Sequence, residues 1–349
     1  MKIGIVGAGF YGVYLSRMLQ NMHEVTLYEQ SDSALQRSGR INQCRLHRGY
    51  HYPRCRETLV QTSHGFVKFL NEFGDFTTII PENIYAFRRD GKSSLDELIK
   101  NSEGISLPVI PTGGPASLKN PAEYEVFLKT DERLISLAEL RHHLLATLRT
   151  TIKTGHRIVE INADTGTVVD QNGVKEQFDW IINTSFTEPN LGLPSEDHFA
   201  HSLELAAMVI MPMSAYPHGA LTIMDGDFIS FYPTDDGRVS LSSVPFTPFF
   251  NTNIFSEFTE AWNQRFELAK KHRVIEKIIE HGRIFLDFEP GSDPQLWIAP
   301  KARLNSFLSD GKPSRVRSHQ RLITVFCGKL DSIYSAQDEI IALLKGTLE

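Results

Sequence analysis

Hydrophobic positions along the chain follow two different periods. Residues 2–6 form an apolar run rich in β-branched side chains, which predicts a buried parallel strand. Between about 201 and 248 apolar and polar positions alternate, which predicts antiparallel strands at 205–211, 219–224, 228–233 and 238–244. Apolar residues keep a helical period in four other segments, at 55–73, 136–150, 255–281 and 333–345.

The order of these segments predicts an α/β fold in which one domain is interrupted. A Rossmann-like nucleotide-binding domain opens the chain, and a helix, strand, hairpin and strand over 136–184 return to its sheet. An inserted α+β substrate domain is built on the antiparallel strands, and a strand at 321–326 with the last helix closes the first domain. We expect the boundaries to fall at 1–74, 75–135 (a cap segment with a strand at 79–87), 136–200, 201–310 and 311–349.

Three glycines follow the first strand at the spacing G-x-G-x-x-G. Gly7 permits a tight turn, Gly9 lets a pyrophosphate approach the backbone, and Gly12 lets the helix pack closely on the strand. Glu29 ends a second strand about 20 residues further on, where a carboxylate accepts hydrogen bonds from ribose hydroxyls. The segment therefore predicts a dinucleotide site, and by itself it does not distinguish NAD from FAD.

The composition limits the kinds of molecule that the protein is expected to bind. The 349 residues have a net charge of −6, which gives no basic field for nucleic acid. Three cysteines without metal-ligand spacing predict no metal site and favour a reducing compartment. The glycine motif begins too early to follow a signal peptide, and no apolar run is long enough to span a membrane. We expect a cytoplasmic protein acting on a small molecule, and its oligomeric state stays open.

An unusual polar segment covers residues 38–54. It is too rich in arginine and histidine for a core element, yet it lacks the composition of a disordered linker. We expect it to line a site.

Three separated segments resemble one family, the FAD-dependent oxidoreductases of the D-amino-acid oxidase superfamily. They are the glycine motif with Glu29, the run from Ser38-Gly39 to Tyr52, and Gly328-Lys329 before the last helix, with Asn183-Thr184 as a similar strand-end turn. The branch with L-2-hydroxyglutarate oxidases and glycerol-3-phosphate dehydrogenases is the most similar. Cys327 stands where that family commonly has a second glycine.

The resemblance implies FAD as the cofactor, bound by a domain of the glutathione-reductase type. The C-terminal part of the chain is also expected to return to the nucleotide-binding domain. This agrees with FAD, because a flavin that extends between two domains needs a second contact with the protein. The expected FAD contacts are Gly7, Gly9, Phe10, Tyr11, Gly12, Glu29, Gln30, Arg37, Asn42, Arg45, Leu46, His47, Ile158, Asn183, Thr184, Gly328, Lys329, Leu330 and Asp331.

The resemblance places residues 42–51 along the flavin ring. His47 is the first candidate for a base, because an imidazole titrates near neutral pH, and a structural histidine is the alternative. Tyr50, His51 and Tyr232 are further catalytic candidates, each with ordinary packing as the alternative. Lys329 is expected to support the flavin's carbonyl edge, and Cys44 and Cys327 to be inert buried thiols, although covalent attachment of FAD stays open.

The expected substrate contacts combine one aromatic residue with several arginines. An arginine can clamp a carboxylate or phosphate by a bidentate bond, and a solvated surface position is the alternative. The candidates are Tyr52, Arg48, Arg238, Arg303 and Arg315.

These residues predict an oxidase or dehydrogenase that moves a hydride to flavin N5 from a C–H bond next to an amine or hydroxyl. The substrate would be a small polar molecule, such as an amino acid, a hydroxy acid or an amino or nucleotide sugar. The alternatives are a redox-neutral or oxygenating flavoenzyme, such as a sugar mutase or a monooxygenase, and a non-catalytic flavin-binding subunit. Substrate identity and electron acceptor stay open.

Overall fold

The opening apolar run forms strand β1 (Lys2–Val6) inside a mostly parallel sheet. The computed structural model describes residues 1–305 and 311–346. The strand order of this first sheet is β20-β21-β13-β1-β2-β9. Its other strands are β2 (Glu24–Tyr28), β9 (Thr151–Lys153), β13 (Trp180–Asn183), β20 (Arg315–His319) and β21 (Leu322–Phe326). Strands from both ends of the chain and from its middle therefore meet in one sheet.

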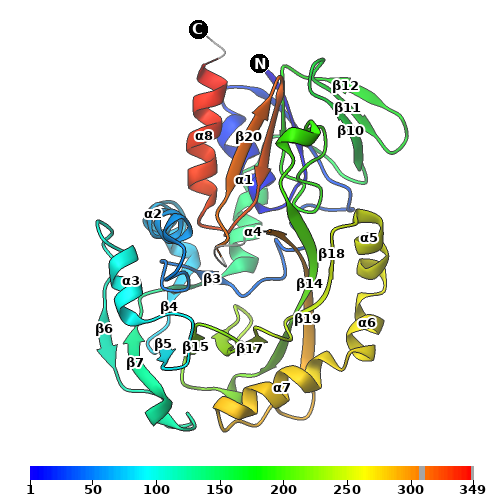
Figure 1. Cartoon of the computed structure of the whole chain (residues 1–349). Coiled ribbons are helices and arrows are strands. Elements are labelled where there is room, and N and C mark those ends of the chain that lie inside the picture. The colour runs from blue at the N-terminus through cyan, green and yellow to red at the C-terminus, as the bar shows by residue number, and fades with distance from the viewer. Residues whose placement is uncertain (306–310, 347–349) are drawn as a thin grey trace.

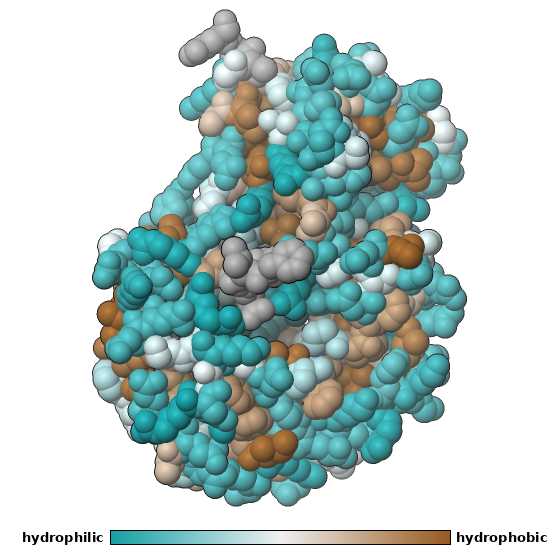
Figure 2. All heavy atoms as spheres, viewed as in Figure 1, coloured by the Kyte–Doolittle hydropathy of each residue, from teal (hydrophilic) through white to brown (hydrophobic). Residues whose placement is uncertain are grey.

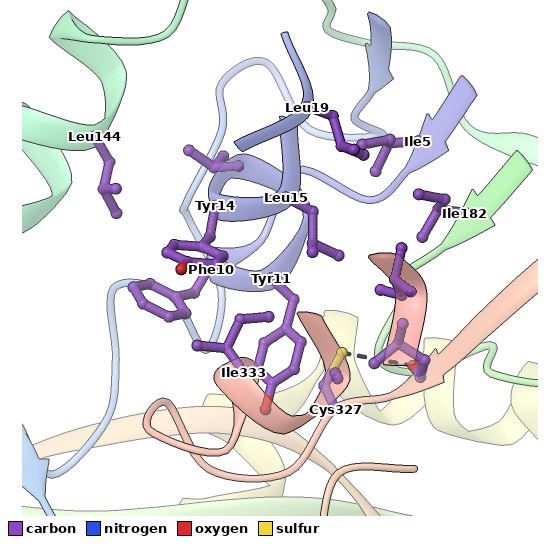
Figure 3. Packing of buried hydrophobic residues seen from close by; sticks show 14 of the residues in the cluster. Ile5, Phe10, Tyr11, Tyr14, Leu15, Leu19, Leu144, Ile182, Cys327 and Ile333 are labelled. Carbon is purple, nitrogen blue, oxygen red and sulfur yellow. Dashed lines mark hydrogen bonds between the residues drawn. The ribbon is translucent and has the colours of Figure 1, made fainter. Parts of the chain in front are cut away.

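Helices pack on this sheet around a shared hydrophobic core. Figure 3 shows α1 surrounded by apolar side chains, with Tyr11 directed toward Cys327 and Ile333 from the end of the chain. Burying such side chains contributes roughly 1.5–3 kcal/mol each. The core thus ties the first residues to the last ones. The helices of this domain are α1 (Phe10–Leu19), α2 (Arg56–Phe73), α4 (Leu137–Ala146) and α8 (Ile333–Lys345).

The hairpin near the middle of the chain differs from the sequence expectation. Its strands form a small sheet of their own, with the order β10-β11-β12, and the strand expected at 157–161 belongs to it. The short strand β9 joins the first sheet instead, by pairing with β2. Residues of β10 are buried on one side only, so this strand covers the sheet rather than extending it. The bounds are β10 (Ile158–Asn162), β11 (Thr167–Asp170) and β12 (Lys175–Gln177).

A second, larger sheet lies at the other end of the molecule (Figure 1). Its strand order is β18-β14-β17-β16-β15-β5-β7-β6, with β19 pairing along β14. Because β5 pairs with β15, the segments expected as a separate cap and substrate domain share this sheet. Residues 306–310 and 347–349, which end the fourth and fifth expected segments, lie outside the described residues. The bounds are β5 (Asn83–Arg88), β6 (Ile110–Thr112), β7 (Tyr124–Lys129), β14 (His201–Pro212), β15 (Ala220–Met224), β16 (Ile229–Pro233), β17 (Arg238–Ser243), β18 (Pro248–Thr252) and β19 (Gln295–Leu304).

Two elements that the sequence predicts as continuous are interrupted in the structure. The helix expected at 255–281 is three helices, because Gln264 leaves the helical conformation and Arg273 has φ of +52°. The strand expected at 79–87 is interrupted around Pro81, which lacks the N–H that a strand donates. The resulting elements are α5 (Phe255–Asn263), α6 (Arg265–Lys271), α7 (Val274–Phe285) and β4 (Thr77–Ile79), and β3 (Arg45–Leu46), β8 (Arg133–Ile135) and α3 (Leu95–Asn101) complete the fold.

The surface seen in Figure 2 is largely hydrophilic, and its hydrophobic side chains are scattered. Among the described residues, no helix combines the length and the apolar character that a membrane span requires. This agrees with the charged and apolar fractions of the sequence, 22% and 41%.

Candidate active site

A cavity of about 660 Å³ lies between the two sheets and is lined by both of them. One end is formed by the glycine motif and Glu29. The other end is formed by the polar segment at 38–54, by β19 and by the loop before α8. The structure thus brings together segments that are separated by almost the whole length of the chain.

The glycine end of the cavity is shaped by the backbone of the G-x-G-x-x-G motif. Gly7 has φ of +96°, and a Cβ on Gly12 would lie 1.9 Å from the carbonyl oxygen of Gly7. A Cβ on Gly9 would meet no described atom within 4 Å, so its surroundings within the protein do not require glycine. Gly9 is the N-cap residue of α1, and it has no side chain to satisfy the first N–H groups of that helix. These groups are available to an anion.

Glu29 faces the same end of the cavity. Its two carboxylate oxygens accept hydrogen bonds from the N–H of Ala8 at 2.9 Å and the N–H of Ser31 at 2.8 Å. Each oxygen keeps a lone pair for another donor. Arg37 also lines this end, and its guanidinium carbon lies 5.3 Å from the centroid of the Trp262 ring.

His47 lies at the opposite end, held on three sides. Its backbone N–H donates to Asp331 Oδ2 at 3.0 Å, and its ring nitrogen Nε2 lies 3.0 Å from Nζ of Lys329. Its Nδ1 lies 3.6 Å from Glu132 Oε1. Burial, followed by the charge of Lys329, lowers the pKa of His47 well below its usual value. The imidazole is therefore neutral at neutral pH.

His51 and Tyr52 extend this wall of the cavity. The ring centroids of His51 and His47 are 5.4 Å apart. Nζ of Lys329 lies over the ring of Tyr52, 5.5 Å from its centroid. Burial, followed by the charge of His47, also lowers the pKa of His51. Burial raises the pKa of Tyr52. All three side chains are neutral, which leaves the cationic groups to set the local charge.

Lysine side chains cluster at this end of the cavity, and two of them were not predicted from the sequence. Lys301 on β19 and Lys312 line the cavity beside Lys329. Burial, followed by repulsion from Lys312, lowers the pKa of Lys301 to about 7. Burial, followed by the charges of Lys312 and Lys301, lowers the pKa of Lys329 further below its usual value. Isolated lysines in strands and loops give no sequence signal of such a cluster.

Several predicted residues lie outside the lining that the described residues form. Tyr50 donates to the carbonyl of Pro108, and Tyr232 to that of Arg133. Four further residues pack behind the cavity wall, namely Gly12, Leu46, Asn183 and Asp331. Three arginines form ion pairs elsewhere: Arg48 with Asp131, Arg238 with Asp236, and Arg315 with Glu57. Their functional roles stay predictions.

The other predicted residues line the cavity, with the exception of Cys44. Arg303 lies there, 3.8 Å from Glu204, and Cys327 lies there as a buried thiol whose pKa burial raises. Cys44 lies away from the lining, with its Sγ toward Asp235. The remaining expected FAD contacts in the lining are Gly7, Gly9, Phe10, Tyr11, Glu29, Gln30, Arg37, Asn42, Arg45, His47, Ile158, Thr184, Gly328, Lys329 and Leu330.

Comparison with known proteins gives one relative that is similar over almost the whole chain and others that are similar over a quarter of it. The FAD-dependent monooxygenase FPY4 of Fusarium mangiferae is 29% identical over 98% of this chain and 91% of its own length. The FAD-dependent monooxygenase kojA of Aspergillus flavus is 33% identical over 87 residues, 25% of this chain and 20% of its own length. No family model matches.

Solved structures share the fold at low sequence identity. L-α-glycerophosphate oxidase from Mycoplasma pneumoniae, with FAD bound, is 14% identical with a TM-score of 0.71 and covers 99% of this chain and 94% of its own. Glycine oxidase from Geobacillus kaustophilus is 14% identical with a TM-score of 0.64, over 97% and 93% of the two chains. The expected fold class is confirmed: the chain has the fold of the FAD-dependent oxidoreductases of the D-amino-acid oxidase superfamily.

Proposed function

We propose that this protein is an FAD-dependent oxidoreductase that removes a hydride from a C–H bond next to an amine or hydroxyl of a small polar substrate. One observation carries the proposal. A single cavity joins a phosphate cradle at Gly9 to a buried polar wall at His47 and Lys329. FAD has the matching shape, with adenosine at one end, a pyrophosphate in the middle and a redox ring at the other end.

The residues present fit FAD at the cradle. The open space at Gly9 and the unsatisfied N-terminus of α1 suit a pyrophosphate, and the spare lone pairs of Glu29 suit the adenosine ribose. Glu29 in place of a basic residue also disfavours a 2′-phosphate. The full-length similarity to an FAD-dependent monooxygenase supports the same cofactor.

Bound FAD supplies two-electron redox chemistry, and the protein's own residues provide the setting. His47 and Tyr52 are buried, and together with the half-buried His51 they form a neutral wall of the cavity. Lys329 brings a nitrogen with a lowered pKa to this wall, where it can hold or release a proton. A small substrate is thereby oriented between cationic and aromatic groups.

The lining at this end favours a polar substrate. Arg45, Lys301, Lys312 and Arg303 contribute positive charge, and Glu204 partly offsets it. Hydroxy acids, amino acids and charged sugars match this chemistry.

The proposal is tested with purified protein and a substrate panel. We expect a yellow protein whose flavin absorbance near the visible maximum bleaches anaerobically with at least one amino acid, hydroxy acid, or amino or nucleotide sugar. A colourless protein that does not bind added FAD would contradict the cofactor. A yellow protein that no member of the panel bleaches would contradict the reaction.

A second candidate function is oxygenation of a substrate. It is favoured by the similarity to the monooxygenase FPY4 along almost the whole chain. The two functions differ in the source of electrons. If NADH or NADPH must reduce the flavin before turnover, and the product gains an oxygen atom, the monooxygenase replaces the oxidase.

A cytoplasmic location stays part of the proposal. Cys44, Cys55 and Cys327 are all free thiols in the structure. Free thiols are typical of a reducing compartment.

A further inference from the structure

A buried carboxylate stands behind His47, on the side away from the cavity. Glu132 lies between β7 and β8, is 1% exposed, and is outside the cavity lining that the described residues form. Its Oε2 accepts from the hydroxyl of Tyr85 at 2.7 Å, and its Oε1 accepts from the N–H of Arg48 at 2.9 Å. These two bonds fix the carboxylate in one orientation.

The two ring nitrogens of His47 meet groups of opposite kind. Nε2 lies 3.0 Å from Nζ of Lys329, which carries hydrogens in both its charged and its neutral form and can donate one of them to Nε2. Nδ1 faces Oε1 of Glu132 at 3.6 Å, and within the described residues this nitrogen has no hydrogen-bond partner. A neutral imidazole carries one proton, so a donor at Nε2 and a carboxylate near Nδ1 both favour the proton on Nδ1.

We propose that Glu132 is a positioning residue that keeps the proton of neutral His47 on Nδ1, so that Nε2 holds Lys329 and Lys329 exchanges the proton with the substrate. This inference rests on the proposed function. It assigns to Lys329 the role that the sequence suggested for His47, because the nitrogen of His47 that could accept a proton is already engaged. The arrangement follows the general rule that a carboxylate behind an imidazole sets its tautomer.

The proton inventory of the step is simple. The proton leaves the N–H or O–H of the substrate and binds Nζ of Lys329 in its neutral form, which becomes an ammonium. His47 keeps one proton throughout, and Glu132 exchanges no proton in this step.

The groups around Lys329 favour the neutral form of its amine. Lys301, Lys312 and Arg45 lower its pKa, together with burial, while Asp331 raises it. Burial raises the pKa of Glu132, and Arg45 opposes that shift. Arg45 reaches Glu132 through the hydroxyl of Tyr85, to which its NH1 donates at 3.0 Å.

The tautomer is measured by NMR on the FAD-bound protein labelled with ¹⁵N-histidine. The signals of His47 are assigned by their loss in His47→Asn. We expect His47 to be predominantly protonated on Nδ1 at pH 7, and the Nε2-protonated share to rise at least fivefold in Glu132→Gln. Glu139→Gln, which removes an exposed carboxylate on α4, is the matched control and should leave the ratio unchanged.

Lys329→Met separates the two influences on His47 and guards against a Glu132 variant that does not fold. The Nδ1 proton should remain in Lys329→Met, because Glu132 is still present. A wild-type His47 protonated on Nε2 would overturn the proposal, and so would an unchanged ratio in a folded Glu132→Gln. These readings need no turnover, so they stand apart from a failure of the proposed function.

The role of Lys329 is measured with whichever panel compound bleaches the flavin. We expect the rate of anaerobic bleaching to rise with pH as Lys329 loses its proton, and to fall at least tenfold in Lys329→Met with loss of that pH dependence. If the pH dependence of the bleaching rate remains in Lys329→Met but disappears in His47→Asn, His47 and not Lys329 exchanges the proton with the substrate. That result would overturn the inference.

Discussion

The guanidinium carbon of Arg45 lies 4.0 Å from the centroid of the Tyr232 ring. Arg45 is 4% exposed, and its nitrogens donate to the hydroxyls of Tyr85, Thr222 and Ser230. The ring therefore covers one face of a buried cation. Tyr232 thus contacts Arg45, which lines the cavity, and is not itself one of the described lining residues.

Removing the hydroxyl of Tyr232 should affect stability more than catalysis. Tyr232→Phe keeps the ring over Arg45 but loses the hydrogen bond to the carbonyl of Arg133 at 3.0 Å. We expect the free energy of unfolding to fall by about 1 kcal/mol. Flavin bleaching by the substrate should change less than twofold. Denaturant unfolding and anaerobic stopped-flow measure the two quantities, and a bleaching rate reduced tenfold or more would restore Tyr232 as a catalytic residue.

Two glycines of the motif should fail in different ways when changed to alanine. Gly9→Ala places a methyl group where no described atom lies within 4 Å, so the FAD-free protein should keep its stability. Its affinity for FAD should fall at least tenfold, because the methyl group occupies space for the pyrophosphate. Gly12→Ala meets the carbonyl of Gly7 at 1.9 Å and should lower the free energy of unfolding by about 1–3 kcal/mol.

Thermal unfolding of the FAD-free proteins and fluorescence titration with FAD distinguish these two variants. If Gly9→Ala binds FAD as tightly as the wild type, the pyrophosphate does not lie at this position. Equal destabilisation by both substitutions would also contradict the assignment.

Local sequence determined much of the first domain because its signals are local. The spacing of Gly7, Gly9 and Gly12 and the apolar run before them depend on neighbours in the chain. β20 escaped prediction because its burial is mixed, and β19 because Lys301 and Arg303 interrupt its apolar run. Their strand character comes from pairing with distant partners, which no local pattern encodes.

The sequence predicted most of the cavity lining around the glycine motif and less of the lining around His47. The segment around His47 stands out because polar residues are concentrated there. Glu132 gives no such signal, since it lies in the polar run Lys129–Arg133 and resembles an exposed turn. It is buried because Tyr85 and the backbone of Arg48, both far away in the chain, surround it.

The charge of Lys301 should make stability depend on pH. Its pKa is lowered to about 7 in the folded protein, first by burial and then by Lys312 and Arg303, with Glu204 opposing. The unfolded chain therefore binds more protons between about pH 7 and the ordinary lysine pKa of about 10.4, so stability from this group rises with pH in that window. Below about pH 7 both states are charged and the full penalty remains.

Lys301→Met removes that penalty. We expect the FAD-free variant to unfold at a higher temperature than the wild type at pH 7, and this gain to shrink as the pH approaches 10. Lys270→Met, at an exposed position on α6, is the matched control. A variant that is no more stable than the wild type at pH 7 would show that the ammonium of Lys301 is compensated in the fold.

The contact between Trp262 and Arg37 should help to retain FAD. Trp262 on α5 belongs to the second domain, and the centroid of its ring lies 5.3 Å from the guanidinium carbon of Arg37 and 4.2 Å from that of Arg265. Trp262→Ala frees Arg37, and we expect FAD affinity to fall about fivefold, since an exposed cation–π contact contributes roughly 1 kcal/mol. Trp262→Phe keeps a ring and should lose less.

Trp297→Ala is the matched control for this contact. Trp297 packs against Arg238 at 5.5 Å, away from the cavity lining of the described residues, so its loss removes a similar contact without touching the FAD end. Fluorescence of released flavin gives the dissociation constant for each protein. If Trp262→Ala and Trp297→Ala weaken FAD binding equally, the effect reflects general destabilisation. If only Trp262→Ala weakens it, and Trp262→Phe restores part of the affinity, α5 of the second domain holds the cofactor in place through Arg37.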